Sequence, residues 1–275
     1  MEKRSAVWPW VVLGVVAIGG VGGWLFKDDL ARLRPAAPAA TTPPPLDGPA
    51  DPSSVPSPAP ATGPTSPRYP LDTDVAADPA LPALADSDAG AWQVLAGVFP
   101  ADVLAVLLRE HLIQRWVVHV DNLTQPSLPA SAMALQPMPG SLQVAQGSDG
   151  VEQLAAANAE RYAPWVKAFT QADAQSLATA YVRFYPLVQQ AYRDIGHPDG
   201  HFNDRLVAVI DHLLQTPEPS GPLAVAPDGK GKYRFVDPAL QSLSVGQKAL
   251  LRLDAGQRKA VKQQLQAIRV AVTRG

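Results

Sequence analysis

The stretch DAGQRKAVKQQLQAIRVAV, residues 254–272, indicates the fold class of this chain most clearly. Its aliphatic residues recur at steps of three and four, which places them on one face of an α-helix. The apolar face comprises Val261, Leu265, Ile268 and Val272, and the basic residues turned away from it are Lys259, Lys262 and Arg269. Asp254 with Gln257, and Ser244 with Gln247, stand at the spacing of a capping box. We therefore expect helices that bury an apolar face in a core.

Helical periodicity also runs through the sequence before this stretch. A helix is expected over 174–195, where Pro186 should kink the axis or split the helix in two. Gly196 should end that helix, because glycine adopts the left-handed conformation of a helix C-terminus. A further helix should follow, with Asn203 or Asp204 as its N-cap.

Other segments complete the expected soluble domain. Pro100 should end a first short helix, after which one apolar stripe continues through 104–120. Strand-like alternation on both sides of Pro227-Asp228-Gly229 predicts a small β-hairpin around a turn. Leu142 and Val144 predict a brief strand. The fold class is therefore expected to be mainly α, with a small β-hairpin.

The N-terminal region has a different composition. No residue from Ala6 to Phe26 is charged, and about 20 residues of helix measure about 30 Å, the thickness of a bilayer's hydrocarbon core. The residues expected to anchor the two ends of this span at the membrane interface are Trp8, Trp10 and Trp24. A cleaved secretory signal is the competing interpretation, but its apolar region would measure only about 7–15 residues. We expect an N-terminal anchor over 1–34, with one transmembrane helix over about 6–26.

A proline-rich segment follows the anchor. Proline fixes φ and lacks a backbone donor, so residues 35–82 should form neither helix nor sheet. We expect a disordered linker over 35–82 and one soluble helical domain over 83–275. Lys and Arg residues nearly balance across the predicted span, but this spacer of low charge resembles those of bacterial envelope proteins. The chain is therefore expected to be a single-pass bacterial inner-membrane protein with a periplasmic C-terminal domain.

Composition excludes several functional classes. A net charge of -2 gives no basic excess to neutralise the phosphates of a nucleic acid. The absence of cysteine rules out disulfides, thiolate metal sites and a cysteine nucleophile. The sequence contains no P-loop, no dinucleotide-binding glycine motif and no G-x-S-x-G. We expect no catalytic residue, no metal site and no cofactor.

Four short motifs follow one another in an order typical of a known family. They are Val120-Asp121-Asn122-Leu123, Tyr185-Pro186-Leu187, His201-Phe202-Asn203-Asp204-Arg205-Leu206, and Leu243-Ser244-Val245-Gly246-Gln247-Lys248 with Leu250-Leu251-Arg252. From about Pro82 to the C-terminus the chain resembles the proteobacterial family named domain of unknown function 3014. The resemblance implies an N-terminal membrane span, a variable proline-rich linker and a C-terminal domain, and it implies no activity. The chain departs from the family after Asn158, where Ala159 stands in place of an expected aromatic residue.

Polar residues within these motifs are the candidates for a contact with a ligand or partner. The candidate residues are Asn203, Asp204, Arg205, Asp121 and Asn122. Short polar side chains commonly cap helices and bond to nearby backbone, so a cap with a buried hydrogen-bond network is the first interpretation. Contact with a polar ligand or partner is the second.

Histidine and basic residues are the remaining candidates for chemistry. His197 and His201 are four apart, but Pro198 and Gly200 forbid a regular helix that would present both to one metal ion. We interpret all five histidines as structural or surface residues. The C-terminal basic residues are Lys248, Arg252, Arg258, Lys259, Lys262, Arg269 and Arg274. A solvated helix face is their first interpretation, and contact with anionic lipid or cell-wall polymer is the second.

These features together favour an interaction or scaffold module tethered in the bacterial envelope. Its expected partners are the lipid bilayer, through the N-terminal helix, and an envelope protein or cell-wall component, with no nucleic acid. The alternative is an envelope hydrolase with an unfamiliar active site. A pocket that joins acid and base residues with shifted pKa values would favour that alternative.

Overall fold

The computed structural model describes residues 66–72, 81–128, 134–136, 140–148, 150–229 and 232–274. The helices are η2 (Leu84–Asp86, a 3-10 turn), α2 (Asp88–Ala96), α3 (Ala101–Leu104), α4 (Leu112–Asn122), α5 (Ala157–Gln171), α6 (Ala174–Asp194), α7 (Phe202–Leu214), α8 (Pro238–Gln241), α9 (Val245–Leu251) and α10 (Ala255–Val272), and the strands are β1 (Val144–Gln146), β2 (Glu152–Leu154), β3 (Val225–Pro227) and β4 (Tyr233–Phe235). The expected span over 6–26, with Trp8, Trp10 and Trp24, lies outside the described residues. In the described ranges, no helix combines the length and the apolar character needed to cross a membrane.

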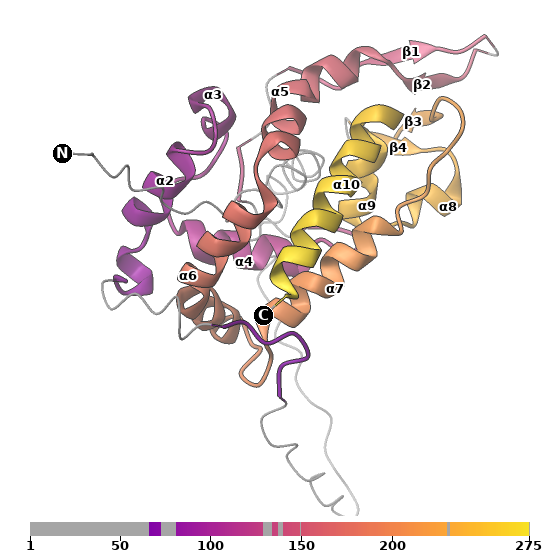
Figure 1. Cartoon of the computed structure of the whole chain (residues 1–275). Helices are drawn as coiled ribbons and strands as arrows, with labels where there is room; N and C mark the ends of the chain where they lie inside the picture. The colour runs from indigo at the N-terminus through magenta and orange to yellow at the C-terminus, as the bar shows by residue number, and fades with distance from the viewer. Residues whose placement is uncertain are drawn as a thin grey trace, which may run out of the picture.

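The C-terminal helix α10 packs against α5, α6 and α7 (Figure 1). Its predicted stripe is buried, with Leu265 fully inaccessible and Val261 at 1% exposure. Asp254 caps the helix by accepting a hydrogen bond from Gln257 N at 2.7 Å. The helix α6 is continuous through Pro186, so that proline does not split it. The predicted mainly helical fold is confirmed.

Aromatic residues from three helices join at the centre of the core. The Trp116 ring of α4 has its centroid 5.1 Å from that of Phe202 on α7 and 6.1 Å from that of Tyr181 on α6. All three side chains are at most 2% exposed. Tilted and edge-on contacts of this kind favour a unique arrangement of rings over a loosely packed core.

The apolar stripe over 104–120 does not form the single helix that its spacing predicts. The helix α3 ends at Leu104 and α4 begins only at Leu112. Between them, Leu107 forms an isolated β-bridge with Leu135 and remains buried at 5% exposure. Helical spacing and burial coincide here without a continuous helix, because Leu108 N donates to Ala134 O and Gln136 N donates to Val106 O in place of further helical bonds.

Asp88 provides the cap that starts α4. Its two carboxylate oxygens accept hydrogen bonds from His111 N at 2.7 Å and from Leu112 N at 2.8 Å. His111 adopts a left-handed conformation with φ of 56°, which few residues other than glycine do. The cap comes from a residue 23 positions earlier in the chain, so local sequence gives no sign of it.

Two β-hairpins lie at one end of the helical core. The predicted hairpin around Pro227-Asp228-Gly229 is present as antiparallel β3 and β4, and Gly229 has a φ of 76°. The strand predicted near Val144 is also present, but it pairs with β2, which the sequence did not reveal. Leu154 N donates to Leu223 O at 3.0 Å, which joins the two hairpins side by side (Figure 1).

Three of the C-terminal basic residues are buried rather than solvated. Lys248, Arg252 and Arg258 are 5–7% exposed, which corrects their interpretation as part of a solvated helix face. Lys248 Nζ donates to Pro126 O at 3.1 Å and lies 3.4 Å from Gln241 O. Burial lowers the pKa of Lys248, and it lowers the pKa of Arg252 to about 10. The Lys248 cation therefore serves to hold the carbonyls of Pro126 and Gln241 in place.

Candidate functional site

The helix α7 places the candidate residues Asn203, Asp204 and Arg205 in its first turn. It begins at Phe202, with His201 as the N-cap and no side-chain capping bond. The prediction that Asn203 or Asp204 caps this helix is therefore wrong. Both side chains instead bind a segment more than 130 positions earlier in the chain.

That segment is residues 66–72, which we call the strap. Asp204 accepts two hydrogen bonds from consecutive backbone amides of the strap, from Arg68 N to Oδ2 at 2.9 Å and from Tyr69 N to Oδ1 at 2.8 Å. A carboxylate that accepts backbone N–H groups makes charge-assisted hydrogen bonds, which are stronger than neutral ones. The strap lies inside the range expected to be a linker, so that expectation does not describe these residues.

Asn203 completes the backbone contacts. Its Nδ2 donates to Tyr69 O at 2.9 Å and to Val272 O at 3.0 Å, and the residue is 1% exposed. One amide therefore joins the strap, α7 and the end of α10. Figure 1 shows the strap, in indigo, close to the C-terminus of the chain.

Side chains of the strap also contact the domain. Tyr69 and Leu71 are partly buried and pack against the main hydrophobic core. The pKa of Arg269 on α10 is raised, first by its hydrogen bonds to Asp211 and also by the Tyr69 side chain. A cavity of about 390 Å³ lies beside Tyr69 and is also lined by Ala208, Asp211 and Gln215. The strap is thus held both by polar contacts of its backbone and by apolar contacts of its side chains.

Asp121 and Arg205 form a second polar cluster on the other side of the first turn of α7. Arg205 Nε donates to Asp121 Oδ1 at 2.7 Å, and its Nη2 donates to Asp121 O and to Thr124 Oγ1. His197 Nε2 lies 3.3 Å from Asp121 Oδ2, and its ring stacks on Tyr192 at 4.3 Å. This cluster ties the end of α4 to α7 and is therefore structural.

Asn122 lies apart from the other candidates. Its Nδ2 donates to Val118 O, one turn earlier in the same helix, at 2.8 Å. The structure thus brings Asn203 and Asp204 together around the strap and pairs Asp121 with Arg205. It does not bring Asn122 to either group.

A buried hydrogen-bond network holds the first turn of α7 in place. Gln189 Oε1 accepts from Phe202 N and from Tyr185 Oη, both at 2.9 Å. Gln189 Nε2 donates to Gly200 O at 2.7 Å. Burial raises the pKa of Tyr185, so its hydroxyl stays protonated and can donate at neutral pH. The expected buried hydrogen-bond network is therefore present, and it positions Asn203 and Asp204 for the strap.

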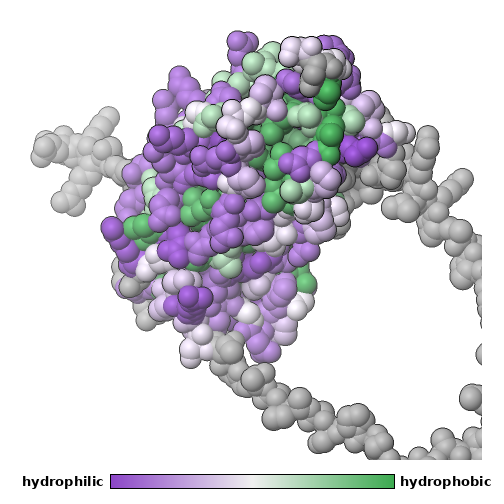
Figure 2. Space-filling model, turned by 90° about the vertical axis from the view of Figure 1, so that its right-hand side faces the viewer, coloured by the Kyte–Doolittle hydropathy of each residue, from purple (hydrophilic) through white to green (hydrophobic). Residues whose placement is uncertain are grey.

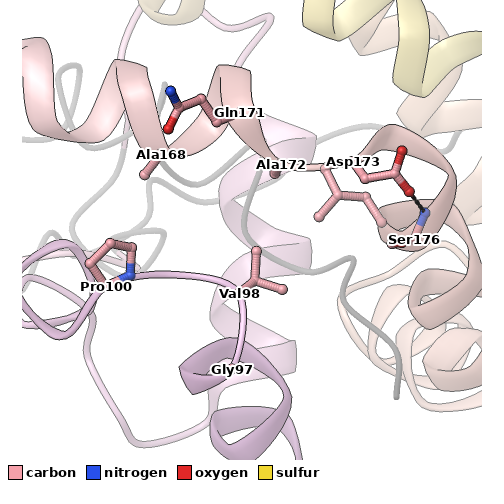
Figure 3. A pocket seen from close by; sticks show the side chains of 9 residues that line it. Gly97, Val98, Pro100, Ala168, Gln171, Ala172, Asp173 and Ser176 are labelled. Atoms are coloured by element: carbon pink, nitrogen blue, oxygen red, sulfur yellow. Dashed lines mark hydrogen bonds between the residues drawn. The ribbon is translucent and has the colours of Figure 1, made fainter. Parts of the chain in front are cut away.

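A second cavity, of about 360 Å³, lies between the loop after α2 and the junction of α5 with α6 (Figure 3). Gly97, Val98 and Ala168 form much of its wall. Asp173 is its carboxylate, and hydrogen bonds from Ser176 lower its pKa. That carboxylate caps α6 by accepting from Ser176 N at 2.7 Å, so it is already engaged. This cavity therefore shows no pair of acid and base.

Among the described residues, His212 and Ser244 form a contact of the kind found in catalytic pairs. His212 Nε2 lies 2.9 Å from Ser244 Oγ, and burial together with the charge of Arg205 lowers the pKa of His212. Ser244 is 6% exposed, and its hydroxyl accepts from Gln247 N in the predicted capping box. Its oxygen therefore serves the cap rather than a substrate. Across the residues that the structure describes, no cluster of three metal-ligating side chains is found.

Sequence reasoning identified Asn203 and Asp204 but missed the segment that they bind. The strap sits among prolines, and prolines led to its assignment as linker. A distinguishing signal was present, because Tyr69 and Leu71 are large apolar residues in a stretch otherwise rich in Pro, Ala, Ser and Thr.

Figure 2 shows that most of one face of the domain is hydrophilic, with hydrophobic residues in separate small areas.

Comparisons with known proteins agree with the motifs. The model of the family described as Protein of unknown function (DUF3014) matches residues 112–269, more than half of the chain. The match includes Asn203, Asp204, Arg205 and Asp121, whereas the strap lies outside it. Comparison with curated proteins and with solved structures finds no match. The chain therefore belongs to the DUF3014 family of proteins of unknown function, as its motifs predicted.

Proposed function

We propose that this protein is a membrane-tethered interaction module of the bacterial envelope. The sequence supports a tether, because an uncharged stretch long enough to span a bilayer is followed by a proline-rich segment. The observation that carries the proposal is the contact of Asp204 and Asn203 with the backbone of the strap, a segment far from them in sequence. Such contacts are the means by which binding modules hold peptides.

The rival proposal is an envelope hydrolase. Its support in the described residues is the Ser244–His212 pair at 2.9 Å, with the pKa of His212 lowered. Activation of a serine requires an accessible oxygen beside the base. The Ser244 oxygen is buried and occupied by the cap of α9, so the geometry supports binding better than hydrolysis.

A topology experiment tests the tether. A periplasm-dependent phosphatase fused after Gly275 should be active, and a reporter that works only in the cytoplasm should be silent there. The opposite pair of signals would place the domain on the cytoplasmic side and contradict the envelope location.

A cross-linking experiment tests the interaction itself. Affinity purification from cross-linked membranes should recover the same envelope component in every replicate. The control is the Asp102→Ala chain, altered at an exposed residue of α3, which should recover it equally. Failure to recover a reproducible component, together with turnover of a cell-wall or lipid substrate that is lost in a Ser244→Ala chain, would favour the hydrolase.

A further inference from the structure

We propose that the strap site is a receptor for a peptide segment of aromatic–proline–aliphatic sequence, which the strap occupies in cis. In this proposal a segment of a partner protein with the same chemistry displaces the strap. The inference rests on the proposed function and names its binding site.

The backbone contacts define the first requirement for a ligand. Both oxygens of Asp204 are used by consecutive amides, those of Arg68 and Tyr69. A ligand therefore cannot carry proline at either of these two positions, since proline has no N–H. Asn203 Nδ2 then donates a hydrogen bond to the carbonyl of the second residue, Tyr69. None of these contacts depends on the identity of a side chain in the strap.

Proline is compatible with the next position. The hydrogen bonds of the site involve the backbone of Arg68 and Tyr69 only, so the missing N–H of Pro70 costs no hydrogen bond. Proline also fixes φ, which lowers the conformational entropy that a peptide loses on binding. The site thus favours a peptide whose backbone is already restricted at this position.

The apolar contacts define the side-chain requirement. Tyr69 and Leu71 pack against the main core from positions two residues apart, on either side of Pro70. Arg68 is exposed, with its guanidinium 5.3 Å from the centre of the Tyr69 ring, so its position tolerates many residues. The preferred ligand is therefore an aromatic residue, a proline and an aliphatic residue in succession.

The strap leaves part of the site unused. Within the described part of the chain, Asn203 Oδ1 is buried and has no hydrogen-bond partner. The cavity of about 390 Å³ beside Tyr69 has room for a further side chain. A buried acceptor without a partner costs free energy, and a ligand that supplies a donor recovers it. A partner peptide can therefore make contacts that the strap does not make.

Because the strap belongs to the same chain, its effective concentration at the site sets the affinity that a competing peptide must have. Only eight residues, 73–80, separate Asp72 from Leu81, the next residue that the structure describes. A short linker gives an effective concentration on the order of millimolar. A peptide added in trans should therefore bind the wild-type chain about tenfold or more weakly than a chain whose strap is disabled.

The test uses the full-length chain in detergent and a fluorescent peptide with the sequence of residues 65–73, TSPRYPLDT. Fluorescence anisotropy should show binding to the Tyr69→Ala chain, weaker binding to wild type, and loss of binding to the Tyr69→Ala chain that also carries Asp204→Ala. A peptide with alanine in place of tyrosine is the matched control. An Arg68→Pro chain, which removes one amide but keeps the core, replaces Tyr69→Ala if that variant unfolds.

Three results would overturn the proposal. One is no binding to the folded strap-disabled chain at about 1 mM peptide, the effective concentration of the strap itself. Another is equal binding with and without Asp204. The third is that the Tyr69→Ala chain captures a wild-type chain but binds no peptide. A second copy of this chain would then be the occupant of the site. An envelope component recovered equally by wild-type and Asp204→Ala chains would leave the proposed function standing without this site.

Discussion

Replacement of Gly246 by alanine should destabilise the domain although Gly246 lies inside a helix. The reason is the close approach of α9 to the end of α4, where Gly246 N donates to Leu123 O at 3.0 Å. A Cβ on Gly246 would lie 2.6 Å from Leu213 Cδ2, 2.9 Å from Leu123 O and 3.3 Å from Leu123 Cβ. Leu213 and Leu123 are 0% and 1% exposed, so neither has space into which to move.

The expected magnitude follows from two opposing effects. Overpacking of a full core costs about 1–3 kcal/mol. Alanine regains about 0.5–1 kcal/mol over glycine through its helix propensity. The net loss should be about 1–2 kcal/mol, because relief of the contact with Leu123 O requires movement of the backbone itself.

Gly90→Ala is the matched control. Gly90 lies in α2, and no atom stands within 4 Å of a Cβ built there. This substitution should raise the free energy of unfolding by about 0.5–1 kcal/mol, the gain in helix propensity alone. Urea unfolding of the full-length chain, followed by circular dichroism, measures both. Equal stability of Gly246→Ala and wild type, or a shift of both variants in the same direction, would refute this reasoning.

Three further predictions concern the core, the histidine and the long-range cap. Leu265→Asp should abolish cooperative thermal unfolding because it buries a carboxylate at a site with 0% exposure, whereas exposed Lys259→Asp should change stability by less than about 0.5 kcal/mol. Folding lowers the pKa of His212 from 6.5, so below about pH 6.5 the unfolded chain binds more protons than the folded chain. The urea midpoint of the wild-type chain should therefore decrease as the pH is lowered from 6.5, and it should decrease less steeply in the His212→Gln chain. Asp88→Ala should cost about 1–2 kcal/mol in the same urea assay by removing the cap of α4, with Asp86→Ala as the near-neutral control.

Amphipathic periodicity predicted the part of the fold that depends on local sequence. The stripe of α10 is buried as expected, and the predicted capping box at Ser244 is present. The stripe over 104–120 failed because Leu107 is buried through a β-bridge to Leu135, and burial alone cannot distinguish a helix from an extended segment. Periodicity reports which face is buried and does not report which distant segment supplies the hydrogen bonds.

Charge was the least informative signal in the C-terminal region. Lys259 is exposed as the helical pattern implies, but Lys248 is buried against the carbonyls of Pro126 and Gln241. Lys262 is turned from the apolar stripe, yet its Nζ donates to Thr216 O at 2.7 Å. Long basic side chains reach carbonyls far along the chain, and sequence spacing carries no record of those partners.

The candidate site shows the same division between local and distant information. Asn203 and Asp204 were identified from their residue types in a motif, and their chemistry as hydrogen-bonding groups was predicted correctly. Their partner could not be predicted, because the strap is 134 positions away from Asn203 and lies in a segment whose prolines predict a linker. A cap was the simplest local use for these side chains, and the strap contact replaced it.

Cleavage by trypsin between Arg68 and Tyr69 tests the strap contact most directly. A protease cuts this bond only when the strap leaves Asp204, so the cleavage rate reports the population of the open form. Asp204→Ala removes two charge-assisted bonds, and a loss of roughly 2 kcal/mol should accelerate cleavage about 30-fold. Asp102→Asn, an exposed carboxylate on α3 away from the strap contacts, should change the rate little. An unchanged rate at Arg68 in Asp204→Ala would contradict the account, because it would show that the strap is not held by this carboxylate.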